Sequence, residues 1–166
     1  MTTRPDPPKL GGEREQLDGF LDFLRGAVVL KATGLTDEQA RRRLVPSELT
    51  TVAGLVAHLT YVEHYWFAVV LDGEPDPWQD LFAEDVDAEF RLGTRTPIER
   101  LVADYEAECG RSREVAARLD LDATGTTAKG EPVNLRWVIV HMIEETGRHA
   151  GHLDLLRELL DGSTGE

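Results

Sequence analysis

The chain has 166 residues, of which 41% are hydrophobic and 30% charged, as is typical of one globular domain with a substantial core. Its formal charge of −13 disfavours nucleic acid and anionic membrane surfaces as partners, because both attract basic patches. We expect no membrane helix, no signal peptide and, with Cys109 as the single cysteine, no internal disulfide, which together favour the cytoplasm.

The N-terminal part of the sequence predicts a tail followed by two helices. The proline-rich residues 1–9 are expected to form a flexible tail, and residues 10–166 a single domain. From about Glu13 to Lys31, apolar residues recur at three- and four-residue steps, which predicts an amphipathic helix. A short connecting helix should run from Thr36 to about Arg43, since Thr36 followed by Gln39 is typical of a capping box.

The same periodicity predicts a second long helix over residues 50–71, which Asp72 and Gly73 should end. A long connection follows over residues 74–96, with a helical turn expected near residues 85–90.

The C-terminal half predicts two more long helices. The third should begin at Thr96 and Pro97, because proline is favoured at the first helical position, and should continue to about residue 119. After an irregular connection, the fourth should run from Asn134 to about Leu160, where Gly162 stops it. No segment alternates apolar and polar residues as a strand would, so the sequence predicts an all-α four-helix bundle with a long connection between helices 2 and 3.

The fourth helix places polar residues in the middle of its inward stripe. The stripe consists of Leu135, Val138, Met142, Glu145, His149, His152, Leu156 and Leu160. At about 100° per residue, Glu145 and His149 point roughly 40° apart, and His152 and His141 lie on the other side of Glu145. Because a buried carboxylate or imidazole without a partner costs several kcal/mol, these side chains require partners.

The second helix can supply a partner, since His58 lies between Leu55 and Val62 on its inward stripe. A glutamate and a histidine four residues apart, with a histidine from a facing helix, can present three ligands to one divalent ion such as Zn²⁺. Three protein ligands that leave coordination positions open are typical of a catalytic site. His64, six residues after His58, should face outward or lie at the edge.

Each of these residues also has a purely structural interpretation. An inward histidine such as His58 is more often a hydrogen-bonded core residue than a ligand, and Glu145 with His149 could be a buried pair. His141 and His152 are more simply explained as lining the cavity, and Cys109 as a small buried residue rather than a nucleophile. Spacing alone leaves both interpretations open.

Two segments of the chain, from Thr51 to Phe67 and from Arg136 to Leu159, resemble the DinB/YfiT-like superfamily, and especially an actinobacterial branch of it. The resemblance implies a four-helix bundle, usually homodimeric, that binds Zn²⁺ or Ni²⁺ through one histidine of helix 2 and a pair four residues apart on helix 4. That pair is commonly His-x-x-x-His. The glutamate variant seen here is similar to the mycothiol-dependent maleylpyruvate isomerases, and it selects His58, Glu145 and His149 as metal ligands.

The resemblance also implies a function, because several superfamily members are S-transferases that use bacillithiol or mycothiol. We therefore expect a divalent-metal-dependent enzyme, with Zn²⁺ as the first choice, mycothiol or another small thiol as cosubstrate, and an electrophilic small molecule as substrate. His152 is the expected catalytic residue, either by hydrogen-bonding a ligand or by orienting the metal-binding histidine. A metal-dependent hydrolase or isomerase without a thiol, and a non-catalytic metal- or ligand-binding bundle, stay open as alternatives.

Pairing into a homodimer is the last implication of the resemblance. Apolar residues that face outward, such as Phe67 or Leu71, are expected to contribute to an isologous patch.

Overall fold

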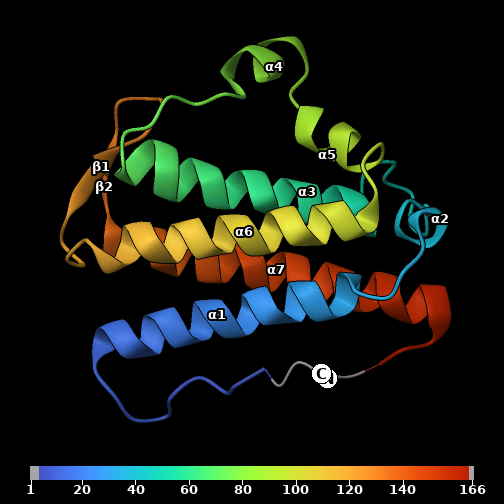
Figure 1. The fold of residues 1–166 in the computed structure, drawn as a ribbon, viewed down its shortest axis with the longest axis horizontal. Helices are drawn as coiled ribbons and strands as arrows, with labels where there is room; N and C mark the ends of the chain where they lie inside the picture. Colours follow the sequence, from blue (N-terminus) through green and yellow to red (C-terminus); the bar gives the residue numbers. More distant parts are fainter. Residues whose placement is uncertain (1–3, 165–166) are drawn as a thin grey trace.

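Figure 1 shows the computed structural model of the chain, which describes residues 4–164. Its long elements are α1 (Glu13–Ala32), α3 (Val52–Glu63) continued by the π-helix η1 (His64–Leu71), α6 (Ile98–Ala117) and α7 (Leu135–Asp161). These elements lie side by side as a bundle, and a long connection joins the second to the third. The all-α four-helix bundle predicted from the sequence is therefore confirmed.

The N-terminal segment was predicted to be a flexible tail, and residues 1–3 of it lie outside the described residues, as do residues 165–166. From residue 4 to residue 12 the chain has no helix or strand. The Arg4 guanidinium nevertheless lies 3.7 Å from the centre of the Phe23 ring, so this segment contacts α1. That residues 10–166 form a single domain stays a prediction.

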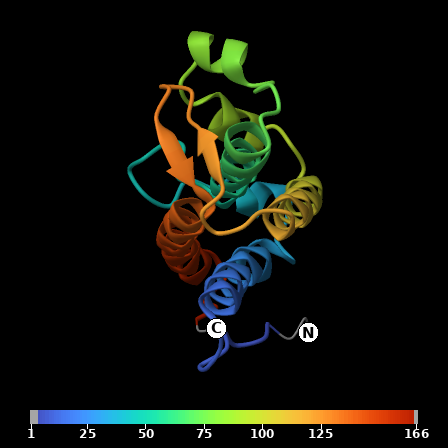
Figure 2. The same ribbon diagram turned by 90° about the vertical axis from the view of Figure 1, so that its left-hand side faces the viewer.

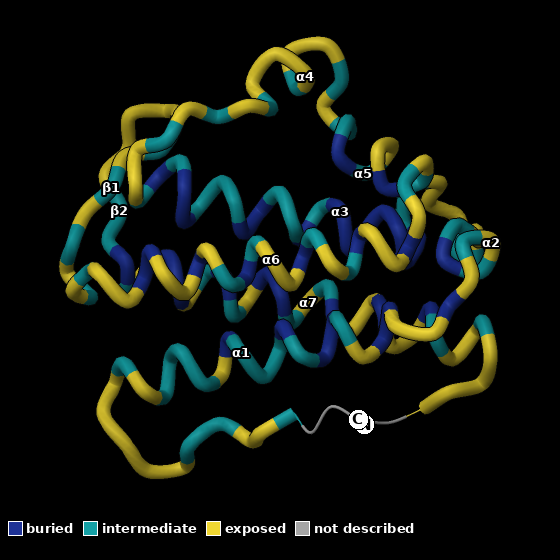
Figure 3. The backbone as a smooth tube through the Cα atoms, in the orientation of Figure 1, coloured by how far each residue is buried: buried dark blue, intermediate teal, exposed yellow. Residues whose placement is uncertain are grey.

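The view along the bundle places α3 opposite α1, with α6 and α7 at the two remaining corners (Figure 2). Helix α3 therefore packs against both α6 and α7. Buried stretches follow the faces that the helices turn toward one another (Figure 3). The largest fully buried side chains include Tyr105, Phe67, Leu21, Leu55, Leu59, Leu135, Ile139, Met142, Leu153 and Leu156. The core thus lies between all four long elements, and polar groups on those faces are held away from water.

The helix ends follow local capping chemistry. The Asn134 side chain accepts a hydrogen bond from the Trp137 N–H at the start of α7, and Gly162 ends that helix with φ of 76°, a left-handed conformation that favours glycine. Both predicted ends of this helix are confirmed. Helix α6 begins at Ile98, so Pro97, rather than the predicted Thr96, is its N-cap residue.

The connections contain more structure than predicted. Helix α2 (Asp37–Ala40) has the predicted capping box between Thr36 and Gln39. Residues 74–96 contain two short helices, α4 (Gln79–Glu84) and α5 (Ala88–Gly93), where a single turn was predicted.

The prediction that the chain contains no strand was wrong. Strands β1 (Thr124–Thr126) and β2 (Pro132–Asn134) form a small antiparallel hairpin in which Thr124 pairs with Asn134. A Cβ atom at Gly125 would lie 2.1 Å from the Val70 carbonyl oxygen, so β1 approaches the end of η1 more closely than any other residue type allows. Three-residue strands are too short to produce a recognisable alternation in sequence.

Phe67 was predicted to face outward, but it is 2% exposed and belongs to the core. The cause is the π-helix η1, because i→i+5 hydrogen bonds put more residues in each turn and shift the register of every side chain after Glu63. Val70 is buried for the same reason, whereas Val69 and Leu71 are partly exposed. Among residues 4–164, no helix is both long and apolar enough to cross a membrane.

Candidate metal centre

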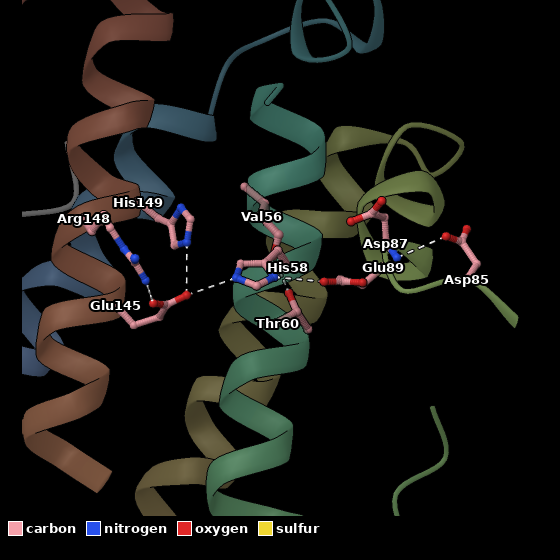
Figure 4. Close-up of polar contacts among 9 residues, drawn as sticks. All are labelled: Val56, His58, Thr60, Asp85, Asp87, Glu89, Glu145, Arg148 and His149. Atoms are coloured by element: carbon pink, nitrogen blue, oxygen red, sulfur yellow. Dashed lines mark hydrogen bonds and ion pairs between the residues drawn. The ribbon is translucent and has the colours of Figure 1, made fainter. Parts of the chain in front are cut away.

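His58 from α3 and Glu145 and His149 from α7 converge between these two helices (Figure 4). One potential ligand atom of each residue lies within 4.8 Å of the other two. Nε2 of His58 and Nε2 of His149 each lie 3.1 Å from the same oxygen, Oε1 of Glu145. The structure thus brings together the three residues that the sequence selected.

The three side chains are largely shielded from water, with exposed fractions of 18% for His58, 9% for Glu145 and 13% for His149. Hydrogen bonds from His149 and His58, supported by Arg148 at the second carboxylate oxygen, hold the pKa of Glu145 well below its usual range. Burial alone would lower the pKa of His58, but hydrogen bonds to Glu145 and to Glu89 outweigh it, so this pKa is raised.

This donor set fits a divalent transition-metal ion. Two imidazole nitrogens and one carboxylate oxygen are ligands that Zn²⁺ and Ni²⁺ accept, at about 2.0–2.2 Å for Zn²⁺. One carboxylate oxygen lies equally close to both imidazoles. A cation at this point would lie within reach of one ligand atom from each of the three residues. His58, Glu145 and His149 could therefore hold one ion and leave its other coordination positions open.

Three neighbours of the cluster were missed by sequence reasoning. Glu89 and Phe90 come from α5 and contact His58, the first through a 3.0 Å contact to Nδ1 and the second by stacking. Nothing in the sequence of the connection marks them, because a six-residue helix gives no periodic pattern. Arg148 forms an ion pair with Glu145, and its i+3 spacing on a helix was a usable signal.

The other two histidines of α7 differ in their contacts with the cluster. His152 is exposed, and its Nδ1 lies 3.3 Å from Nδ1 of His149, the ring nitrogen that does not face Glu145. His141 is half-buried and stacks on Trp137, with ring centroids 5.1 Å apart, while Trp66 meets it edge-on. His152 thus contacts a candidate ligand directly, and His141 contacts an aromatic group.

His64 was expected to face outward or to lie at the edge of the bundle, and it does not face outward. Its side chain is only 13% exposed, and Nδ1 lies 3.1 Å from Oε1 of Glu108 on α6. The side of α3 that turns away from α7 is covered by α6, so it is not a solvent-facing side.

Cys109 is buried in the core, as the structural interpretation predicted. Burial raises the pKa of its thiol, which leaves little thiolate at neutral pH. The geometry therefore offers no support for a nucleophilic role of this residue.

Comparisons with known proteins place this geometry in context. A family model described as mycothiol-S-transferase matches residues 16–162. Among solved structures, the crystal structure of the mycothiol-dependent maleylpyruvate isomerase superposes with a TM-score of 0.64 and 16% sequence identity, covering 84% of this chain and 60% of that one. The chain thus spans about 60% of the length of that isomerase, and at this identity the likeness shows the fold alone. No curated protein matches the chain significantly.

Proposed function

Because the chain belongs to the mycothiol S-transferase family, we propose that it is a divalent-metal-dependent enzyme that transfers mycothiol, or a related small thiol, to an electrophilic small molecule. Family membership agrees with the resemblance drawn from the second and fourth helices. The observation that carries the proposal is the convergence of His58, Glu145 and His149, since a thiol transferase needs a means of ionising its thiol near neutral pH.

The metal would be held by the two imidazoles and the Glu145 carboxylate, and its charge would favour the thiolate form of the thiol. Arg148 is paired with the carboxylate oxygen that does not contact the imidazoles, and so keeps Oε1 turned toward them. The proposed ligand set contributes one negative charge. It therefore leaves net positive charge on a divalent ion, which favours an anionic sulfur.

The chemical step that we propose is a nucleophilic substitution or addition. The thiol sulfur forms a bond to the electrophilic carbon, and the electron pair leaves with the departing group or moves into the attacked double bond. The thiol proton passes to solvent. The attacking sulfur belongs to the cosubstrate, so Cys109 has no part in the reaction.

We propose that His152 orients His149 rather than acting on the substrate. The contact between their Nδ1 atoms supports this role, because a ligating histidine is normally fixed through its other ring nitrogen. His152→Ala should then weaken metal binding by less than the loss of a ligand does. An unchanged metal affinity with lost transfer activity would instead make His152 a catalytic residue.

The direct test is a thiol-transfer assay on metal-loaded and metal-free protein. Mycothiol, glutathione and cysteine are offered in turn with model electrophiles, monochlorobimane among them. We expect acceleration by the metal-loaded protein, strongest with mycothiol, and loss of it in Glu145→Gln but not in the control Glu158→Gln, which changes an exposed glutamate further along α7. No acceleration beyond the metal-free protein would contradict the transferase assignment and favour a hydrolase, an isomerase or a binding protein.

We also propose that the chain works as a homodimer in the cytoplasm. Exposed apolar side chains along α7 support pairing: Trp137, Val140, Leu155 and Leu159. The unpaired cysteine supports a reducing compartment. Light scattering should give twice the chain mass of 18.5 kDa, and a monomer mass throughout the micromolar range would contradict the pairing.

A further inference from the structure

His58 is held from two directions by neighbouring residues of α5. Oε1 of Glu89 lies 3.0 Å from Nδ1 of His58, while Glu145 lies at the opposite ring nitrogen, Nε2. The Phe90 ring stacks on the imidazole, with centroids 4.6 Å apart and planes inclined by 13°. Figure 4 shows His58 lying between Glu89 and Glu145. One edge and one face of the ring are therefore fixed by a helix that carries none of the three candidate ligands.

Glu89 is poorly placed for stability alone. The residue is 5% exposed, and its second carboxylate oxygen, Oε2, is buried with no hydrogen-bond partner among the described residues. A buried carboxylate with an unsatisfied oxygen costs free energy, and an apolar residue at the same position would avoid that cost. The contact with His58 gives this carboxylate a role that packing does not.

Helix α5 reaches His58 because its backbone lies directly on α3. A Cβ atom at Gly93 would be 2.5 Å from the carbonyl oxygen of Ala53 and 2.8 Å from Cβ of Ala57. Glycine at this position and alanines opposite it allow the two helices to approach closely, next to His58 in the sequence. The close approach brings the side chains of Glu89 and Phe90 into contact with the imidazole of His58.

We propose that Glu89 is a positioning residue of the metal site. Its carboxylate accepts a hydrogen bond from the Nδ1–H group of His58, which leaves Nε2 facing the metal. The stacked Phe90 ring fixes the plane of the imidazole. A histidine bonded through one ring nitrogen to a carboxylate has its tautomer and orientation set for a metal at the other. The long connection between α3 and α6 is then part of the site. This role rests on the metal site proposed above, but not on thiol transfer.

The test compares Glu89→Gln with Glu84→Gln, a matched change of an exposed glutamate in the neighbouring helix α4. Zn²⁺ affinity is measured by competition with a chromophoric chelator, and circular dichroism checks that each variant is folded. We expect Glu89→Gln to bind Zn²⁺ about 10- to 100-fold more weakly, which is the usual effect of replacing the hydrogen-bond partner of a metal-bound histidine. Glu84→Gln should match the parent. Equal affinity of parent and Glu89→Gln, or equal loss in both variants, would overturn the role.

A second readout follows His58 itself. In ¹⁵N-labelled protein loaded with Zn²⁺, the Nδ1 proton of His58 should be slow to exchange and shifted by its bond to the carboxylate, and Glu89→Gln should change both properties. A loss of affinity with an unchanged Nδ1 signal would show that Glu89 does not act through His58, and would overturn the proposal.

Gly93→Ala tests the same role without changing Glu89, because the added Cβ must push α5 away from α3. The folded variant should show the same altered Nδ1 signal and weaker Zn²⁺ binding, although Glu89 is intact. A normal Nδ1 signal in Gly93→Ala would contradict the placement by α5. Neither readout uses a thiol, so a parent that binds Zn²⁺ but transfers no thiol leaves this role standing, whereas a parent that binds no Zn²⁺ overturns the metal site and this role together.

Discussion

Glu63 and Glu145 are both buried glutamates that face basic groups inside the bundle, yet their surroundings differ. Glu63 of α3 is fully buried, and its two oxygens accept hydrogen bonds of 2.7 and 2.6 Å from Arg25 of α1. Glu145 divides one oxygen between two imidazoles and retains some exposure. The first is a closed pair, in which Arg25 occupies both oxygens of Glu63 and also donates from Nη1 to the more exposed Asp22. The second, the open cluster, is a carboxylate with titratable partners.

The two sites differ more in the type of hydrogen-bond donor than in the depth of burial. A guanidinium is always charged and matches a carboxylate in two parallel bonds, so the Arg25–Glu63 pair requires nothing further. Burial alone would lower the pKa of Arg25, but the charge of Glu63 raises it overall, so this pair stays ionised. An imidazole can give up its proton near neutral pH and offer a lone pair to a metal instead.

Loss of one partner should have its largest effect at the closed pair. Arg25→Met removes one partner and leaves the Glu63 carboxylate buried and unpaired, which should lower the free energy of unfolding by about 3–5 kcal/mol. Urea unfolding followed by circular dichroism measures this loss. The metal affinity of the folded protein should be unchanged, because the pair joins α1 to α3 and contains none of the three candidate ligands.

Two controls sharpen this result. Arg118→Met removes a half-exposed ion pair with Asp72 and should cost about 0–1 kcal/mol. Adding Glu63→Leu to Arg25→Met removes the stranded charge and should restore much of the stability. A loss below about 1 kcal/mol in Arg25→Met would mean that the pair is not a closed structural unit.

Substitutions in the open cluster should change metal affinity more than stability. His58→Ala, Glu145→Ala and His149→Ala should each reduce Zn²⁺ affinity more than about 100-fold, beyond the range of residues that only support a ligand. His64→Ala is the control, since it removes the contact with Glu108 on α6 without changing metal affinity. Chelator competition measures the affinities, and equal losses in all four variants would move the site elsewhere.

Zn²⁺ binding should stabilise the folded protein, and it should do so only through the open cluster. At a free Zn²⁺ concentration about 100 times the dissociation constant, binding should add about 2.7 kcal/mol to the free energy of unfolding. The gain is measured as the difference between melting curves with and without Zn²⁺, and it should persist in Arg25→Met but vanish in Glu145→Ala. The same gain in Glu145→Ala would show that Zn²⁺ binds at another place.

The smallest effect is expected at Cys109, which lies in the core near the closed pair. Burial, followed by the charge of Glu63, raises the pKa of this thiol, so the reactive thiolate is scarce at neutral pH. A chromogenic disulfide reagent should label Cys109 slowly in native protein and rapidly in urea, and Cys109→Ser should keep most of the activity. Fast labelling of the native protein would contradict the burial of this residue.

The local sequence determined the positions of the long helices and one side of the site. Glu145 and His149 share a helix, where backbone hydrogen bonds repeat about every 3.6 residues and fix their relative direction. The same rule placed His58 on an inward stripe, and the preference of asparagine for the N-cap placed Asn134 at a helix start. It failed from His64 to Leu71, because a π-helix breaks the repeat on which the rule depends.

Which groups meet across elements follows from tertiary packing. Glu89 reaches His58 from 31 residues further along the chain, Glu63 pairs with Arg25 across 38 residues, and His64 is covered by α6 rather than by water. Such contacts depend on how helices and connections pack. Packing is the sum of many weak contacts and leaves no periodic mark on the sequence around any single residue. The sequence therefore determined the candidate ligands, and the packing of α5 on α3 decided how one of them is held.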